Sequence, residues 1–110
     1  MTAVFSKSLR ELVDRRADGR CERCGAFTDD VQYHHRRARG MGSTRRPESA
    51  GAANCLRCCL NCHALIESQR ADAMFAGFLV SQYADPADTP VWRLGQWVVL
   101  DDMGGWTVRA

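Results

Sequence analysis

The chain has 110 residues and a formal net charge of +2, which predicts a single domain over residues 1–110 with a modest core. No stretch approaches the length of a membrane span and the N-terminus has no apolar signal region, so we expect a cytoplasmic protein rather than a membrane-bound or secreted one. In that reducing compartment the six cysteines favour metal binding over disulfides.

The first predicted element is a helix over residues 8–17. Leu9 and Val13 recur at helical spacing, Ser6 or Ser8 can cap the start, and Asp18-Gly19 ends it. We expect this N-terminal segment, residues 1–20, to pack over the metal-binding end of the domain.

Two Cys-x-x-Cys motifs, Cys21–Cys24 and Cys59–Cys62, predict a structural zinc site. Each pair can grip an ion from a tight turn, and together they supply the four thiolates of a closed tetrahedral site. The 34 residues between the motifs exceed a simple zinc ribbon, so a further unit is inserted there.

Cys55 and Cys58 form a third Cys-x-x-Cys, which competes with this assignment. We predict a strand over residues 54–60, where positions three apart point to opposite faces and cannot easily share one ion. Because free cysteine is a common small buried residue, we assign Cys55 and Cys58 to the core.

Residues 31–34 predict a short strand that pairs antiparallel with residues 54–60. The connecting loop, residues 36–53, is long for a hairpin, which is typical of a functional loop. From Val31 to Leu60 there is one acid, Glu48, against six arginines: Arg36, Arg37, Arg39, Arg45, Arg46 and Arg57. A basic patch beside metal-ligand residues is typical of a nucleic-acid binder, whereas a solvated loop is the plainer alternative.

After this pair we predict a helix from residue 60 or 61 to about 69, which places His63 and Glu67 on one face. A second short helix follows over residues 71–76, and residues 78–83 are apolar enough to be buried. The C-terminal predictions are strands at 91–94 and 97–100 and a turn at 101–105 that leads into residues 106–109, with three tryptophans packing a small hairpin.

Four residues in this layout suit phosphodiester hydrolysis. His34 and His35 close the first strand, Asn54 opens the second, and His63 lies on the following helix, which can bring the three histidines into one pocket. Histidine takes a proton near neutral pH, histidine and carboxylate ligands hold a divalent cation, and an amide can hold a loop in place.

The motifs HHR at 34–36, NCLRCCLNCHALIE at 54–67 and CERCG at 21–25 resemble the HNH endonucleases, in particular the small zinc-bound HNH proteins of phages. The resemblance covers about half the chain and implies an α+β fold with a ββα-metal motif on a zinc-stapled core, residues 21–70. An N-terminal helix and a C-terminal helix-and-hairpin extension, residues 71–110, lie outside that core.

The resemblance also implies roles for individual residues. His35 would be the general base, Asn54 would orient the base and its loop, and His34 and His63 would bind the catalytic metal. The structural zinc would be held by Cys21, Cys24, Cys59 and Cys62. Arg36, Arg37 and Arg57 are our candidates for binding DNA phosphate with low sequence specificity.

Two positions depart from the family pattern. Many members carry a histidine where this chain has Glu67, and a carboxylate there favours Mg²⁺ or Mn²⁺ as the catalytic ion. Many also carry aspartate in place of His34.

The resemblance implies DNA as substrate and suggests a phage terminase as partner, in the host cytoplasm. The alternatives are a non-catalytic zinc module that binds DNA and a protein that docks a partner enzyme.

Overall fold

The computed structural model describes residues 5–37 and 50–109 of the chain. Most of the predicted arginine-rich loop, with Arg39, Arg45, Arg46 and Glu48, lies outside the described residues. In the part that is described, no helix is long and apolar enough to cross a membrane.

Helix α1, Lys7–Ala17, forms where the sequence predicted it. The hydroxyl of Ser6 caps the helix by accepting a hydrogen bond of 3.2 Å from the Leu9 amide. The helix ends at Asp18, which adopts a left-handed conformation with φ of 53°. Val13 and Arg16 are buried, so one side of α1 packs onto the rest of the chain.

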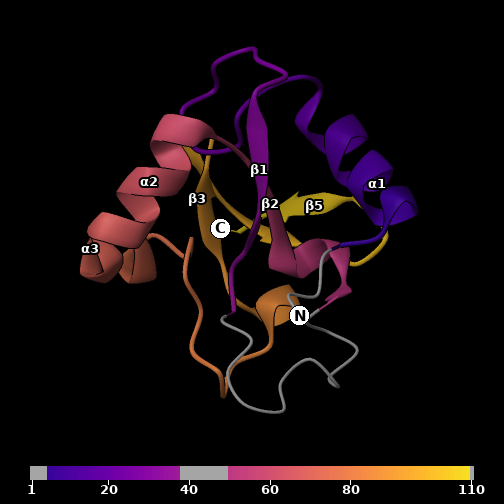
Figure 1. The fold of residues 1–110 in the computed structure, drawn as a ribbon. Coiled ribbons are helices and arrows are strands. Elements are labelled where there is room, and N and C mark those ends of the chain that lie inside the picture. Colours follow the sequence, from indigo (N-terminus) through magenta and orange to yellow (C-terminus); the bar gives the residue numbers. More distant parts are fainter. Residues whose placement is uncertain (1–4, 38–49, 110) are drawn as a thin grey trace.

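Strand β1, Val31–His35, pairs antiparallel with β2, Cys55–Cys59, as predicted. His35 lies opposite Cys55 and Val31 opposite Cys59, and helix α2, Leu60–Ser68, follows β2 directly. Figure 1 shows α1 on one side of this strand pair and α2 on the other. The chain therefore has a small α+β architecture in which α2 starts at the end of β2 that lies beside the start of β1.

The C-terminal part forms a three-stranded antiparallel sheet rather than the predicted hairpin. This part begins with the helix α3, Arg70–Phe75. The strands of the sheet are β3, Val91–Arg93, β4, Gln96–Leu100, and β5, Trp106–Val108. Val98 on β4 lies opposite Val91 on one side and Val108 on the other, which makes β4 the central strand. The third strand forms because the turn after Leu100 folds the chain back along β4.

The segment from Phe78 to Tyr83 is buried only in its first half. Phe78 and Val80 are buried, as predicted, but Tyr83 is 96% exposed, so the prediction for the end of the segment is wrong. The amide of Val80 donates to the Arg36 carbonyl oxygen at 2.8 Å, which ties the buried half to the chain leaving β1.

The core confirms that Cys55 and Cys58 are buried on different faces of β2. Cys58 belongs to a cluster with Leu56 and Ile66, whereas Cys55 packs with Phe5 and Val13 beneath α1. Both cysteines are 0% exposed. The alternation of side chains along a strand explains this separation.

A buried carboxylate joins the separate elements. Glu22 is 0% exposed and accepts hydrogen bonds from Arg16 at 2.7 and 2.8 Å, from Arg93 at 2.7 Å and from the Arg57 amide at 2.9 Å. Burial alone would raise the pKa of Glu22, but the two adjacent guanidinium groups and the amide outweigh it and hold the pKa below its ordinary value. Glu22 thus links α1, β2 and β3 as an ionised group.

We predict that Glu22→Gln lowers the free energy of unfolding by about 3–5 kcal/mol, because it leaves two buried guanidinium groups without their carboxylate. Urea unfolding at saturating zinc measures the change. Glu11→Gln, at an exposed position of α1, is the matched control and should stay within about 0.5 kcal/mol of the unmodified chain. A loss below about 1 kcal/mol for Glu22→Gln would contradict the structural role assigned to it.

Candidate functional site

The four predicted zinc ligands lie together. The sulfur atoms of Cys21, Cys24, Cys59 and Cys62 are all within 4.8 Å of one another. The Cys24 and Cys59 sulfurs are 3.9 Å apart, close to the ~3.8 Å that tetrahedral geometry requires for zinc–sulfur bonds of about 2.3 Å. This cysteine cluster is therefore compatible with a structural metal ion such as zinc.

Hydrogen bonds to the sulfur atoms of the cysteine cluster favour the thiolate form, and therefore the binding of a cation. The amides of Arg23 and Cys24 donate to the Cys21 sulfur at 3.4 and 3.5 Å, and the Cys62 amide donates to the Cys59 sulfur at 3.4 Å. The Arg23 guanidinium also donates to the Cys62 sulfur at 3.3 Å. Such donors stabilise thiolate, which is the form that binds metal.

The pKa values within the cluster show why a cation suits it. The neighbouring Cys58 thiol, helped by backbone amides, lowers the pKa of Cys21 to about 3 against the effect of burial. Burial raises the pKa of Cys62 to about 12, and the neighbouring cysteines add to that effect. Four adjacent sulfurs therefore do not all ionise by themselves, whereas a divalent cation offsets their mutual repulsion.

A second cluster joins β1 to α2. The ligand atoms of His34, His63 and Glu67 lie within 4.8 Å of one another. The rings of His34 and His63 are 5.3 Å apart between centroids, and His63 Nε2 lies 4.0 Å from Glu67 Oε1. His63 and Glu67 are one helical turn apart on α2, so the structure brings together the three residues predicted to hold the catalytic ion.

His34 is held in the form that can bind a metal. Its Nε2 lies 2.7 Å from the Phe78 carbonyl oxygen. Because a carbonyl oxygen only accepts hydrogen bonds, Nε2 carries the proton and Nδ1 keeps a lone pair for a ligand. Burial lowers the pKa of His34 to about 4, so the ring is neutral at pH 7. A metal-binding histidine commonly has this kind of carbonyl partner on its other nitrogen.

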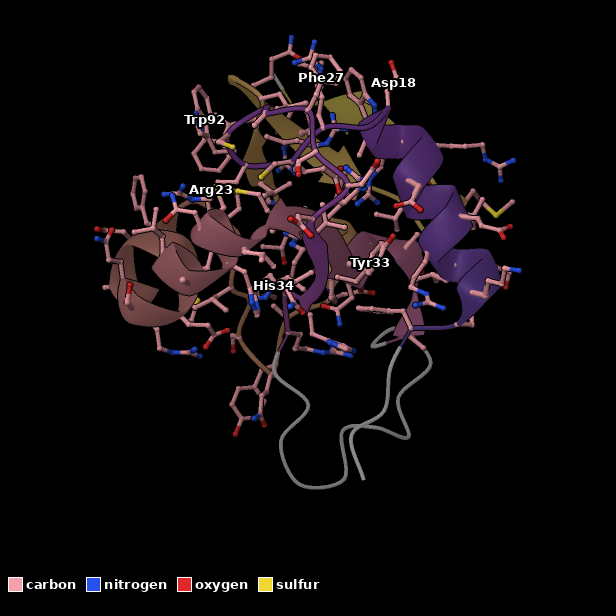
Figure 2. The ribbon with its side chains drawn as sticks, turned by 45° about the horizontal axis from the view of Figure 1, so that its top comes forward. Asp18, Arg23, Phe27, Tyr33, His34 and Trp92 are labelled. Carbon is pink, nitrogen blue, oxygen red and sulfur yellow. The ribbon has the colours of Figure 1, made fainter. Side chains whose placement is uncertain are left out.

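His35 does not join that cluster, in contrast to the expectation of one pocket for three histidines. Figure 2 shows Tyr33 on the side of β1 that faces α1 and His34 on the side that faces α2. Side chains two apart in a strand share a face, so His35 lies on the side of Tyr33. Its ring stacks on Phe5, with centroids 4.0 Å apart and an interplanar angle of 18°.

Asn54 holds the chain that leaves β1. It is fully buried in a short 3-10 helix, Ala52–Asn54, just before β2. Its side-chain oxygen accepts a hydrogen bond of 2.7 Å from the Arg37 amide, and its carbonyl oxygen accepts one of 2.8 Å from the Arg36 amide. These contacts are the type of loop-holding interaction that the sequence suggested for this asparagine.

The three arginines predicted to bind phosphate are buried instead. Arg36, Arg37 and Arg57 are 0%, 2% and 5% exposed. Arg36 donates to four backbone carbonyl oxygens, those of Ala53, Gly77, Pro86 and Thr89. Arg37 donates to the Ala84 carbonyl and Arg57 to Asp14. Their guanidinium groups are buried and pair with acceptors of the protein itself, so the structure does not present them to a phosphate.

Sequence reasoning overlooked Arg70, which lies beside the second cluster. Its Nη1 is 3.0 Å from Glu67 Oε2, and its side chain is exposed. The signal in the sequence was that Arg70 follows Glu67 by three positions, a spacing at which side chains are neighbours on the surface of a helix.

We predict that Cys24→Ser weakens metal binding at the cysteine cluster, because serine does not replace a thiolate ligand for zinc. Cobalt substitution measures this through the intensity of the sulfur-to-cobalt absorption bands, which should fall in Cys24→Ser. Cys55→Ala is the matched control and should retain the full bands, since Cys55 lies outside the cluster. Full bands in Cys24→Ser, or their loss in Cys55→Ala, would show that the ligand set is a different one.

No family model matches the chain, and neither a curated protein nor a solved structure matches it. The interpretation of the site therefore rests on the geometry of its own residues, together with the motifs at 21–25, 34–36 and 54–67.

Proposed function

We propose that the protein is a metal-dependent endonuclease that hydrolyses DNA phosphodiesters at the cluster of His34, His63 and Glu67. The observation that supports this most is the convergence of two imidazoles and a carboxylate from β1 and α2 within 4.8 Å. Two imidazole nitrogens and a carboxylate oxygen suit Mn²⁺, and the carboxylate also suits Mg²⁺.

The proposed reaction is a simple hydrolysis. The oxygen of a water molecule attacks phosphorus, the bond between phosphorus and O3′ breaks, and O3′ keeps the bonding electron pair and takes up a proton. The products carry a 5′-phosphate and a 3′-hydroxyl. A bound divalent cation would neutralise charge on the phosphate and the leaving oxygen.

In this proposal His34 offers Nδ1 to the metal while the Phe78 carbonyl fixes its ring. The resemblance to HNH endonucleases assigns the general base to His35, and Asn54 holds the backbone just beyond it. Because the His35 ring stacks on Phe5 on the other face of β1, its role has to be tested separately from those of the metal ligands.

The cysteine cluster supports the same helix. The Cys59 sulfur caps α2 by accepting from the Cys62 amide, and Cys62 directly precedes His63. A structural zinc would therefore hold the first turn of α2, and with it the position of His63.

The proposal includes low sequence specificity of the nuclease for its DNA substrate. A phage terminase is the proposed partner that directs cleavage to its site.

We predict that wild type converts supercoiled plasmid to nicked and linear forms in Mg²⁺ or Mn²⁺ but not in EDTA. His63→Ala should abolish cleavage and weaken Mn²⁺ binding. His35→Ala should slow cleavage by about 10²–10⁴-fold with Mn²⁺ affinity unchanged, as expected for loss of a general base. Plasmid cleavage and Mn²⁺ titration, on proteins of equal zinc content, measure these effects.

Gln32→Ala is the control on β1, because Gln32 is exposed and lies outside the cluster. Cleavage by His35→Ala at the wild-type rate would remove His35 from the chemistry without affecting the metal site. Wild type that cuts in no divalent metal, alone or with a terminase, would overturn the nuclease proposal.

One observation favours partner docking as the second candidate. Met74, Phe75, Trp92 and Trp97 line two grooves that share Phe75 and Trp97, and Phe75 is 83% exposed. Large exposed apolar patches commonly mark interaction sites. Under this candidate Phe75→Ser would weaken association with a terminase subunit in a pull-down titration, whereas His63→Ala would leave it unchanged.

A further inference from the structure

The proposed reaction brings an anionic phosphate to the metal, and the arginines first assigned to bind that phosphate are buried. Arg36, Arg37 and Arg57 are at most 5% exposed. Arg70, by contrast, is an arginine whose side chain is 56% exposed and which lies directly against the cluster of His34, His63 and Glu67.

The contact between Arg70 and Glu67 places a guanidinium next to the metal ligands. Arg70 Nη1 donates to Glu67 Oε2 at 3.0 Å, while the other oxygen, Oε1, lies 4.0 Å from His63 Nε2. One carboxylate therefore separates the guanidinium from the imidazole. If Glu67 binds a cation through Oε1, Arg70 can keep its bond to Oε2.

The backbone explains how Arg70 reaches this position. Helix α2 ends at Ser68, and Gln69 adopts a non-helical conformation with φ of −121° and ψ of 62°. Arg70 is the first residue of α3, on a new helix axis, and yet its side chain returns to α2. The break at Gln69 thus allows the first residue of α3 to contact Glu67 on α2.

The guanidinium can bind a phosphate as well as the carboxylate. It has five N–H donors in a planar fork, and one of them serves Glu67. Both partners are half exposed, and such surface pairs stabilise a fold only weakly, so a phosphate can recruit Arg70 at little cost to stability. The positive charge also offsets the repulsion between Glu67 and an approaching phosphate.

We propose that Arg70 binds the scissile phosphate beside the metal held by His34, His63 and Glu67, an inference that rests on the proposed nuclease function. Arg70 is then the residue that makes the carboxylate at position 67 compatible with an anionic substrate.

The test compares Arg70→Gln and Arg70→Lys with Arg15→Gln, an exposed arginine on α1. Affinity for a DNA duplex is measured in Ca²⁺ over a range of salt concentrations, cleavage in Mn²⁺ gives kcat and KM, and calorimetry gives Mn²⁺ affinity. We expect Arg70→Gln to raise KM about tenfold and to reduce the slope of log affinity against log salt by about 0.9, the value for one lost phosphate contact. Arg70→Lys should restore most of the affinity, and Arg15→Gln should match wild type.

Three results would overturn the inference, and they can be told apart. If Arg70→Gln binds and cuts as wild type does, Arg70 does not contact the phosphate. If Arg70→Gln loses Mn²⁺ affinity with an unchanged salt slope, Arg70 acts only by positioning Glu67. If wild type neither binds nor cuts DNA in any divalent metal, the nuclease proposal itself fails and takes this inference with it.

Discussion

The structure depends most on the buried carboxylate of Glu22. The residue stands between Cys21 and Cys24 of the cysteine cluster, and its oxygens accept from Arg16 on α1, Arg93 on β3 and the backbone of β2. A small domain has little apolar area with which to join its elements, and a fully paired ion cluster supplies directional contacts in its place. Because such a cluster tolerates no missing partner, it also fixes how α1, β2 and β3 are arranged.

The pairing of buried charged groups also explains why the arginine content was a misleading sign of phosphate binding. An arginine-rich segment beside metal ligands favours a phosphate-binding interpretation, yet Arg36 is enclosed by four carbonyl oxygens from three separate segments. Those segments are turns and short 3-10 helices, in which backbone pairing is incomplete, so their carbonyl groups need donors from side chains. Arginine meets that need because one guanidinium can serve several acceptors at once.

The two candidate metal clusters are connected through the start of α2. Cys59 caps the helix and Cys62 lies in its first turn, while His63 and Glu67 face the other cluster. His34 reaches His63 from β1, and the Phe78 carbonyl holds its ring from the segment after α3. The second cluster therefore draws on three parts of the chain, and the cysteine cluster orders the helix that supplies two of its residues.

Local signals in the sequence determined the helices, the antiparallel strand pair and the four clustered cysteines, because caps, alternation and Cys-x-x-Cys spacing act over a few residues. The third C-terminal strand could not be placed in the same way, since it depends on pairing with β4. Strand alternation also contained the information that His34 and His35 point apart, although the expectation of a shared pocket ignored it.

Only the tertiary structure decided which charged and polar groups are available for chemistry. The burial of Arg36, Arg37 and Arg57, the stacking of His35 on Phe5 and the arrival of the Phe78 carbonyl at His34 all result from contacts between distant segments. Residue type and spacing do not encode which way a long side chain turns when buried acceptors compete with solvent for it. The sequence by itself thus determined the candidate metal ligands, and packing decided which neighbouring side chains are exposed and able to contact a substrate.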